Sequence, residues 1–445
     1  MKTGRTNLPF SPYINFKLDN GIEVFAENID TVQSVSIGMF LRSGVLYESD
    51  NMRGVSHLIE HMMFKGTLNR SPKDIASEFD RIGGCLNAFT AKDYCCYYAR
   101  VVKDKFEVAI DVLADMLINS QFVNEELERE RKVILEEIKM YEDSPDEIIH
   151  ELLGQNIWKN SRLGNPILGT SNTVSSMTRN DVFEFFKNQY VAENLLICIA
   201  GNFDQQNLKK MLSEKLSLMR KGSFNSDFFD FDTMAHSSVY IKEIEQVHLT
   251  LGTEGLAFSD ERRFPLTILN AAFGGGMSSR LFQEIREKRG MAYTVYSYHT
   301  SFKNTGLFGI YAGTSMEHLA HVLELFYSEI QNIAENGLTD SELDDTREQI
   351  KGTVMLSLES TTNRMNRLSA NFLYDTEVKT PEEAIKPYLA VNSQQIKDIA
   401  KQILDEKKMA ITMIAPTQNA VDILKKSPFS QRELTVGKLG ANVLR

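Results

Sequence analysis

Two histidines and a glutamate stand close together near the N-terminus, in the order His57, Glu60 and His61. On a helix, residues four apart leave the same face, so both imidazoles could close on one metal ion. Imidazole nitrogens at this spacing suit Zn²⁺, and a carboxylate beside them can take a proton from water that the metal acidifies. The stretch therefore predicts the chemistry of a peptidase, with Glu60 as general base.

The surroundings of these three residues strengthen this interpretation. With eight histidines in 445 residues, a chance H-x-x-E-H match is roughly a one in a hundred event. The neighbouring positions are apolar, as in a helix that is buried on its other faces: Val55, Leu58, Ile59, Met62 and Met63. Because burying a polar side chain is costly without a partner, we expect the polar residues of this helix to have one.

Composition is that of an ordinary globular protein. The chain has 445 residues, more than a single hydrophobic core usually serves, so two or more domains are expected. Hydrophobic residues make up 42% and charged residues 24% of the chain. The formal net charge of -11 argues against nucleic acid or an anionic membrane as partner, because phosphate binding needs a basic surface.

No targeting or membrane-spanning segment is recognisable in the sequence. The first ten residues lack the apolar stretch of a secretory signal, and no run of about 18 apolar residues follows. Four cysteines lack the spacing of a metal finger: Cys85, Cys95, Cys96 and Cys198. The adjacent pair would form only a strained bridge, so we expect four reduced thiols in a cytoplasmic protein.

Local signals around the three residues predict strands and capped helices. An Asn-Gly turn at 20–21 between two alternating segments predicts a β-hairpin at the start of the chain. Serine followed by proline at 71–72 predicts the start of a helix. Further strands are expected at 85–90 and 94–102. The first half of the chain is therefore predicted to combine antiparallel sheet with helices.

A long charged helix is predicted over 124–140, with acids in its first turn. Most of its charges form pairs three or four residues apart and are expected to be solvated. Glu130 and Glu137 differ, because they share a stripe with Val133 and Ile134 that we expect to be buried. A carboxylate among apolar neighbours favours a cation as its partner.

The second half of the chain repeats the order of elements in the first. Residues 220–238 show no periodicity and are predicted to form a linker. A strand, an apolar helix, aromatic strands and two long helices then follow in the earlier order. We therefore predict a metal-binding peptidase domain over 1–219 and a homologous domain over 239–445.

The repeat lacks the polar residues of the first copy. Matching position 49 to position 259 gives an offset of 210 residues, because both positions begin a Ser-Asp pair. At this offset the counterparts of the two histidines and the glutamate are Thr267, Asn270 and Ala271. In the long helix a Glu-Leu match gives an offset of 216 and puts Thr353 in place of Glu137. The second domain is thus expected to have the architecture without the ligands.

Together these features resemble the pitrilysin (M16) family of zinc metallopeptidases, the inverzincins. The family signature is H-x-x-E-H followed about 76 residues later by a glutamate, and Glu137 lies 76 residues after His61. The chain is most similar to short bacterial members that resemble the beta subunit of the mitochondrial processing peptidase. The resemblance implies that His57, His61 and Glu137 bind one Zn²⁺ per chain. It also implies that Glu130 orients a liganding histidine.

The resemblance implies substrate-binding residues in both halves. Asn87, Ala88 and Phe89 resemble an edge strand that pairs with the backbone of an extended peptide, although an ordinary strand remains an alternative. Arg286 and Tyr293 match a pair in the family, and the tyrosine hydroxyl could donate to the oxyanion of the reaction. For Tyr293 the alternative is an aromatic ring packed in a strand.

The expected fold is α+β, with two tandem homologous domains that each carry helices on one face of a mainly antiparallel sheet. The resemblance implies half of a clamshell, with a homodimer enclosing a chamber for short or unfolded peptides. The expected function is zinc-dependent hydrolysis of internal peptide bonds. A non-catalytic subunit or a chaperone-like peptide-binding protein is the alternative, but no residue of the metal and base set is missing.

Overall fold

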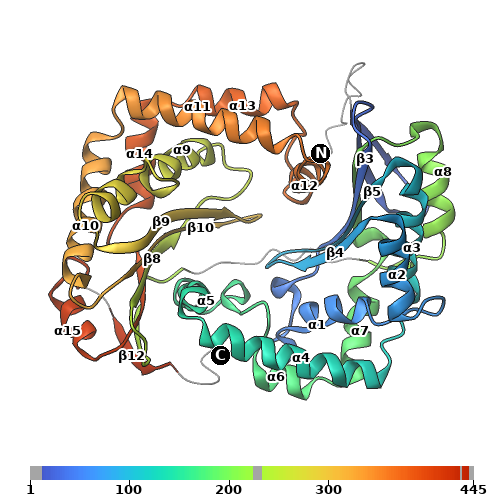
Figure 1. The fold of residues 1–445 in the computed structure, drawn as a ribbon, viewed down its shortest axis with the longest axis horizontal. Helices are drawn as coiled ribbons and strands as arrows, with labels where there is room; N and C mark the ends of the chain where they lie inside the picture. The colour runs from blue at the N-terminus through green and yellow to red at the C-terminus, as the bar shows by residue number, and fades with distance from the viewer. Residues whose placement is uncertain (1–12, 224–232, 431–432, 440–445) are drawn as a thin grey trace. The chain divides into compact units, whose positions relative to one another are not determined.

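Two β-sheets organise the computed structural model, which describes residues 13–223, 233–430 and 433–439. Each sheet has six strands in the described residues, and helices pack against both sheets (Figure 1). The two sheets are mainly antiparallel and have equivalent orders for five strands, whereas the outer strand is the first strand, β1, in one sheet and the last strand, β12, in the other. The predicted α+β fold with two homologous domains is therefore confirmed.

The N-terminal sheet has the strand order β1-β2-β6-β3-β5-β4. Its strands are β1 (Tyr13–Lys17), β2 (Glu23–Asn28), β3 (Ser34–Leu41), β4 (Cys85–Thr90), β5 (Cys95–Val102) and β6 (Leu195–Gly201). Neighbouring strands are antiparallel except for β2 and β6. Strand β6 is buried along its whole length, whereas β4 is the last strand of the sheet and pairs with β5.

The C-terminal sheet has the order β12-β7-β11-β8-β10-β9. Its strands are β7 (Ser237–Ile241), β8 (Val247–Glu254), β9 (Ala292–Ser301), β10 (Gly306–Thr314), β11 (Ala410–Ala415) and β12 (Leu434–Lys438). Buried β11 corresponds to β6, and β9 corresponds to β4 as a strand at the end of the sheet. Each sheet thus ends on one side with a strand that pairs with the next strand of the sequence, β4 with β5 and β9 with β10.

Helices occur where the capping signals predict them. The first half contains α1 (Val55–Met63), α2 (Pro72–Ile82), α3 (Phe106–Asn119), α4 (Asn124–Asp143), α5 (Pro145–Ile157), α6 (Ser171–Ser176), α7 (Arg179–Gln189) and α8 (Gln205–Leu216). Helix α2 begins with a capping box at Ser71 and ends at Gly83 in the left-handed conformation. These boundaries follow from local sequence alone.

The second half begins its helices with α9, the counterpart of α1. They are α9 (Arg263–Gly274), α10 (Leu319–Asn336), α11 (Asp340–Ser357), α12 (Thr361–Leu373), α13 (Pro381–Leu389), α14 (Ser393–Ile403) and α15 (Asn419–Lys426). Between α9 and β9 the chain forms a π-helix, Phe282–Glu287. Such turns are rare and are enriched at functional sites.

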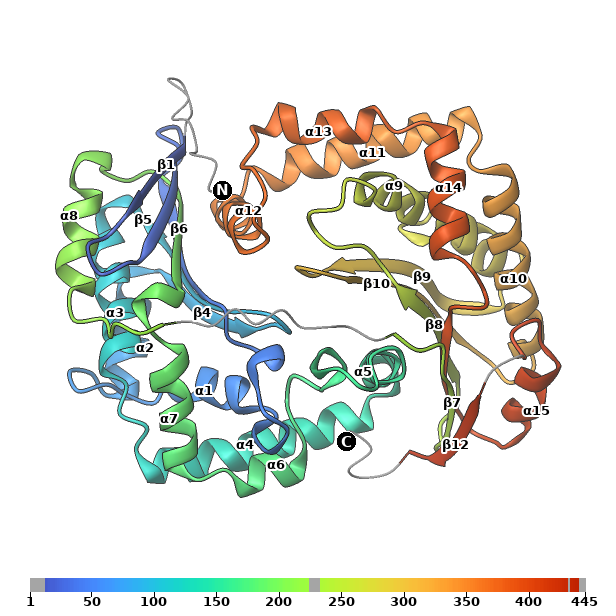
Figure 2. The same cartoon turned by 180° about the vertical axis from the view of Figure 1, so that it is seen from behind.

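The two halves exchange one helix each. Helix α5 of the first half packs on β8 and β11, and α12 of the second half packs on β2, β3 and β6. In both views α12 covers the face of the N-terminal sheet opposite to α3 (Figures 1 and 2). A Cβ at Gly38 would lie 2.9 Å from Sδ of Met365. One at Gly252 would lie 2.7 Å from Cδ2 of Leu153, so glycine permits the close approach of each exchanged helix.

Two compact units result from this exchange. The first comprises 1–134, 172–228 and 356–378, and the second comprises the remaining segments. The units therefore divide the chain differently from the sequence boundaries 1–219 and 239–445, because each contains a helix from the other half. Residues 224–232 of the predicted linker lie outside the described residues, and β7 begins at Ser237.

Two expectations about the chain's environment can be compared with the structure. The four cysteines are free thiols, and three of them are buried. Among the helices in the described ranges, none combines the length and apolar character that crossing a bilayer requires.

Candidate metal centre

Helix α1 holds the two histidines and is fixed at its first turn by a buried acid. Gly54 adopts φ 89° immediately before the helix, a conformation that glycine favours. The N–H groups of Gly54 and Ser56 donate to the carboxylate of Glu48 at 2.8 and 2.9 Å. Burial raises the pKa of Glu48 to about 7, against the opposing effect of these donors. The start of α1 is thus tied to the preceding loop.

His57 is prepared to act as a neutral ligand. Its side chain is only 8% exposed, and its ring lies 4.7 Å from the ring of His61 between centroids. Burial, and then the neighbouring imidazole, lowers the pKa of His57 to about 3. Because metal binding requires the neutral imidazole, His57 is ready to bind a cation at neutral and mildly acidic pH.

His61 is oriented by a carboxylate from α4. Its Nδ1 lies 3.0 Å from Oε2 of Glu130, and a carboxylate can only accept a hydrogen bond, so Nδ1 carries the proton and donates. In this tautomer Nε2 of His61 carries no proton, as a metal ligand requires. The other oxygen of Glu130 forms an ion pair with Lys65 at 2.8 Å. Glu130 is therefore held from both sides, as expected of a residue that orients a ligand.

Glu137 joins the two histidines from α4, two helical turns after Glu130. One ligand atom from each of His57, His61 and Glu137 lies within 4.8 Å of the others. Two imidazoles and one carboxylate suit Zn²⁺, whose donor atoms stand about 3.4 Å apart in a tetrahedral site. The predicted ligand set is thus brought together by α1 and α4, and the residues present fit zinc.

The stripe of α4 that carries the two acids differs from the prediction in one respect. Ile134 is buried as expected, but Val133 is 49% exposed. Periodicity identifies residues that share a stripe, but it does not show what covers them. Glu130 is nonetheless only 6% exposed, so it is not a solvated surface acid.

Glu60 lies on α1 between the two histidines and is held by the edge strand. The hydroxyl of Thr90, the last residue of β4, donates to Oε2 of Glu60 at 2.5 Å. Helix α1 packs on β4 along this contact. A carboxylate next to the histidines of the ligand set is in the position that a general base needs.

Strand β4 has the open position predicted for peptide binding. Asn87 is exposed, while Ala88 and Phe89 are half-buried. Asn87 accepts a hydrogen bond from the N–H of Ala88 at 2.8 Å, and the ring of Phe89 contacts Tyr94 and Tyr98. The position of β4 at the sheet edge is confirmed, whereas contact of these residues with a substrate stays a prediction.

Arg286 and Tyr293 lie together in the second unit. The guanidinium of Arg286 lies 4.8 Å from the ring centre of Phe282 and 4.9 Å from that of Tyr293, so it contacts both rings. The π-helix supplies Phe282 and Arg286 from neighbouring turns. Tyr293 is 74% exposed. The alternative of a packed aromatic in a strand is therefore wrong, and the hydroxyl of Tyr293 is accessible.

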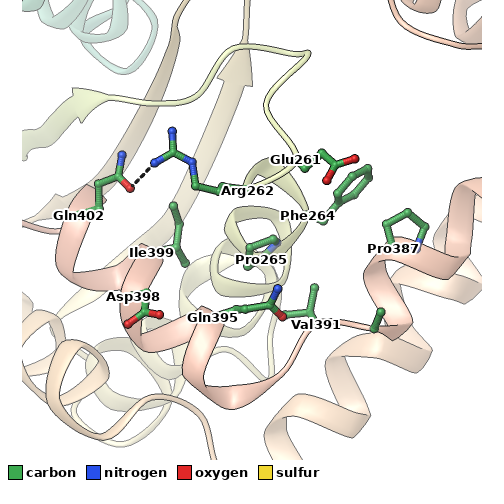
Figure 3. Close-up of a pocket in the computed structure, with 11 residues that line it drawn as sticks. Glu261, Arg262, Phe264, Pro265, Pro387, Val391, Gln395, Asp398, Ile399 and Gln402 are labelled. Carbon is green, nitrogen blue, oxygen red and sulfur yellow. Dashed lines mark hydrogen bonds between the residues drawn. The ribbon is translucent and has the colours of Figure 1, made fainter.

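Two cavities of the second unit lie among other residues. One, of about 520 Å³, lies between α9, α13 and α14 and is lined by Phe264, Pro265, Val391 and Ile399 among others; Figure 3 draws the residues that line it. An adjacent one of about 630 Å³ shares Arg262 and Gln402 with it. Neither cavity includes a residue that the sequence predicts for metal, catalysis or substrate.

Three residues of the site were missed in the sequence. Lys65 continues the four-residue spacing of His57 and His61, and this spacing is a signal that could have identified it. Glu48 lies in a loop, where no periodicity exists. Thr90 is 30 residues from Glu60, so only the packing of β4 on α1 brings the two together. Contacts of this kind depend on the tertiary fold.

Comparison with protein families agrees with this geometry. Residues 23–171 match the model of the insulinase family (peptidase family M16), and residues 176–350 match that of the peptidase M16 inactive domain. The first of these matches includes His57, His61 and Glu137, and the second begins within the first half of the chain. Together they cover most of the chain.

Individual relatives extend over nearly the whole chain. An uncharacterized zinc protease of Bacillus subtilis, YmxG, is 40% identical over 91% of this chain and 98% of its own length. An uncharacterized zinc protease of Streptomyces coelicolor is 36% identical over 90% of this chain and 89% of its own.

Solved structures show the same fold at lower sequence identity. A peptidase M16 inactive domain from Pseudomonas fluorescens has a TM-score of 0.86 at 22% identity, covering 91% of this chain and 98% of that one. A protease from Helicobacter pylori has a TM-score of 0.85 at 18% identity, covering 91% and 99%. With its metal-ligand set, its two matching domains and its named zinc protease relatives, this chain belongs to the M16 family of peptidases.

Proposed function

We propose that this protein is a zinc-dependent endopeptidase that hydrolyses internal bonds of short or unfolded peptides. The observation that carries the proposal is the convergence of His57, His61 and Glu137, with Glu60 beside the histidines. Three protein ligands are typical of catalytic zinc, whereas structural zinc usually has four. The relatives named as zinc proteases support the same conclusion.

The site's own residues divide the chemistry among them. Zinc, when bound, supplies a Lewis acid that acidifies water and polarises the peptide carbonyl. Glu60 accepts the proton of the attacking water and returns it to the leaving amine. Glu130, braced by Lys65, keeps His61 in the tautomer that binds the metal.

We assign substrate binding to the edge strand β4 and to the neighbouring side chains of Arg286 and Tyr293. An extended peptide would add to the edge of β4 through backbone hydrogen bonds, next to Asn87, Ala88 and Phe89. Arg286 and Tyr293 are proposed to contact the peptide, with the hydroxyl of Tyr293 donating to the developing oxyanion. We further propose a cytoplasmic homodimer with one Zn²⁺ per chain.

The decisive variant is Glu60→Gln, which removes the base and keeps the shape of the side chain. We expect this variant to bind zinc like the wild type and to cleave a quenched fluorogenic peptide roughly 100- to 10,000-fold more slowly. Glu136→Gln, which changes an exposed acid on α4, serves as the matched control and should cleave normally.

Two outcomes would contradict the proposal. A Glu60→Gln variant that cleaves at the wild-type rate would remove Glu60 from its role. A zinc-loaded wild type that binds peptides without cleaving them would instead favour the chaperone-like or non-catalytic alternative. Addition of a chelator should abolish cleavage by the wild type, and restoring zinc should recover it.

A further inference from the structure

The hydroxyl of Thr90 connects the edge strand to the proposed base. Thr90 ends β4 and pairs with Cys95 of β5, while its side chain donates to Oε2 of Glu60 at 2.5 Å. Both side chains are half-buried, so solvent screens this hydrogen bond only in part. A hydrogen bond to a charged acceptor is stronger than one between neutral groups.

The homologous domain has a related contact without the acid. Helix α9 packs on β9 as α1 packs on β4. Ser297 of β9 donates to Oδ1 of Asn270 at 2.8 Å, and the repeat places Asn270 at the position of Glu60. A strand hydroxyl therefore contacts the same helix position in both domains, although Thr90 is the last residue of β4 and Ser297 lies four residues before the end of β9. Because no acid takes part in the second contact, it provides an internal reference for the first.

We propose that Thr90 is a positioning residue that fixes the carboxylate of Glu60 and links peptide binding on β4 to catalysis. The terminal torsion of a glutamate is broad, so a free carboxylate samples many orientations. Holding Oε2 also fixes the direction of Oε1, because the two oxygens belong to one planar group. Because Thr90 belongs to the edge strand, a peptide that pairs with β4 also orders the residue that holds the base.

This inference rests on the proposed peptidase function and is tested with the full-length, zinc-loaded protein. Thr90→Val removes the hydroxyl at nearly constant volume. We expect it to lower kcat for a quenched peptide by about 10-fold, while KM and zinc content stay within about twofold of the wild type. Thr90→Ser restores a hydroxyl and should recover most of kcat. Thr90→Ala, which also lacks the hydroxyl, is the second variant if valine prevents folding.

Ser297→Ala is the control, because it removes the hydroxyl that contacts Asn270, the counterpart of Glu60, in the second domain. It should leave kcat unchanged even if it lowers the unfolding temperature. Wild-type kcat in both Thr90→Val and Thr90→Ala would overturn the inference and leave the proposed function intact. Equal losses of kcat in Ser297→Ala and Thr90→Val, or no recovery in Thr90→Ser, would also overturn it. Absence of cleavage by the zinc-loaded wild type would overturn both the function and the inference.

Discussion

The two domains share the order of five strands but differ in the helices that carry the candidate metal ligands. In the first, α1 presents His57, Glu60 and His61, whereas in the second, α9 carries Thr267, Asn270 and Ala271 at the positions given by the repeat. Asn270 is satisfied by Ser297, and Thr267 by the carbonyl of Arg263 in its own helix. In the second domain, two side chains at these positions thus form hydrogen bonds with nearby residues, whereas in the first domain the two histidines converge with Glu137 on a candidate cation site. The fold tolerates both solutions.

Two buried histidines, His57 and His150, also differ in what their ring nitrogens contact. Burial lowers the pKa of both His57 and His150, to about 3 and about 4. His150, on α5, has hydrogen bonds of 2.8 and 3.0 Å to the hydroxyls of Tyr298 and Tyr296, so both ring nitrogens are occupied. A neutral histidine is therefore a structural element in the second compact unit and a candidate metal ligand in the first. What it contacts, and not its protonation state, decides its role.

The largest effect is expected from removing a ligand in the first domain. His61→Ala should weaken zinc binding by roughly 1,000-fold or more, because even residues behind the ligands contribute about 10- to 100-fold. Competition with a fluorescent zinc chelator would measure this change. Thr267→Ala in α9, at the counterpart of His57, is a control in the second domain and should leave zinc affinity unchanged. Equal zinc affinity in the wild type and His61→Ala would place the metal elsewhere.

A smaller loss is expected when the residue behind the ligand is removed. Glu130→Ala takes away the acceptor of the His61 Nδ1 proton and the partner of Lys65, so zinc affinity should fall by about 10- to 100-fold. Lys65→Met should weaken it less, because Lys65 contacts the carboxylate and not the ligand. Isothermal titration with zinc would rank the variants. An effect of Lys65→Met exceeding that of Glu130→Ala would contradict this order.

The smallest effect is expected from substituting His150, which should change the free energy of unfolding of the protein. Since the pKa of His150 is lowered by burial, its stabilising contribution is complete above about pH 6.5 and is lost as the pH falls through about 4. His150→Gln can bond both tyrosines without titrating. The unfolding free energy of the wild type relative to this variant should therefore fall by about 1–2 kcal/mol between pH 7 and pH 4. Denaturant unfolding at several pH values measures it, and a constant difference would show that His150 does not titrate in this range.

Much of the fold was predictable because its signals are local. The Asn-Gly hairpin, the Ser71 cap and the strand at 85–90 depend on turn chemistry and periodicity, and all three are found where predicted. The exchange of α5 and α12 was not predicted. An apolar stripe on a helix shows that it packs, but not on which sheet.

The site was predictable to the extent that spacing encodes it. His57 and His61 follow from a four-residue spacing on one helix. Glu137 is 76 residues away and came from family resemblance, because no local rule joins α4 to α1. Lys65, Thr90 and Glu48 were missed, since their roles arise from tertiary contacts. Val133 was wrongly expected to be buried for a related reason: periodicity does not specify what covers a stripe.

Anomalous X-ray scattering at the zinc edge, from crystals of the zinc-loaded protein, tests the difference between the domains most directly. The account predicts one peak per chain, within about 2.3 Å of nitrogens of His57 and His61 and an oxygen of Glu137. No peak should lie beside Thr267, Asn270 or Ala271. A peak in the second domain, or none beside the two histidines, would contradict the assignment of the metal centre.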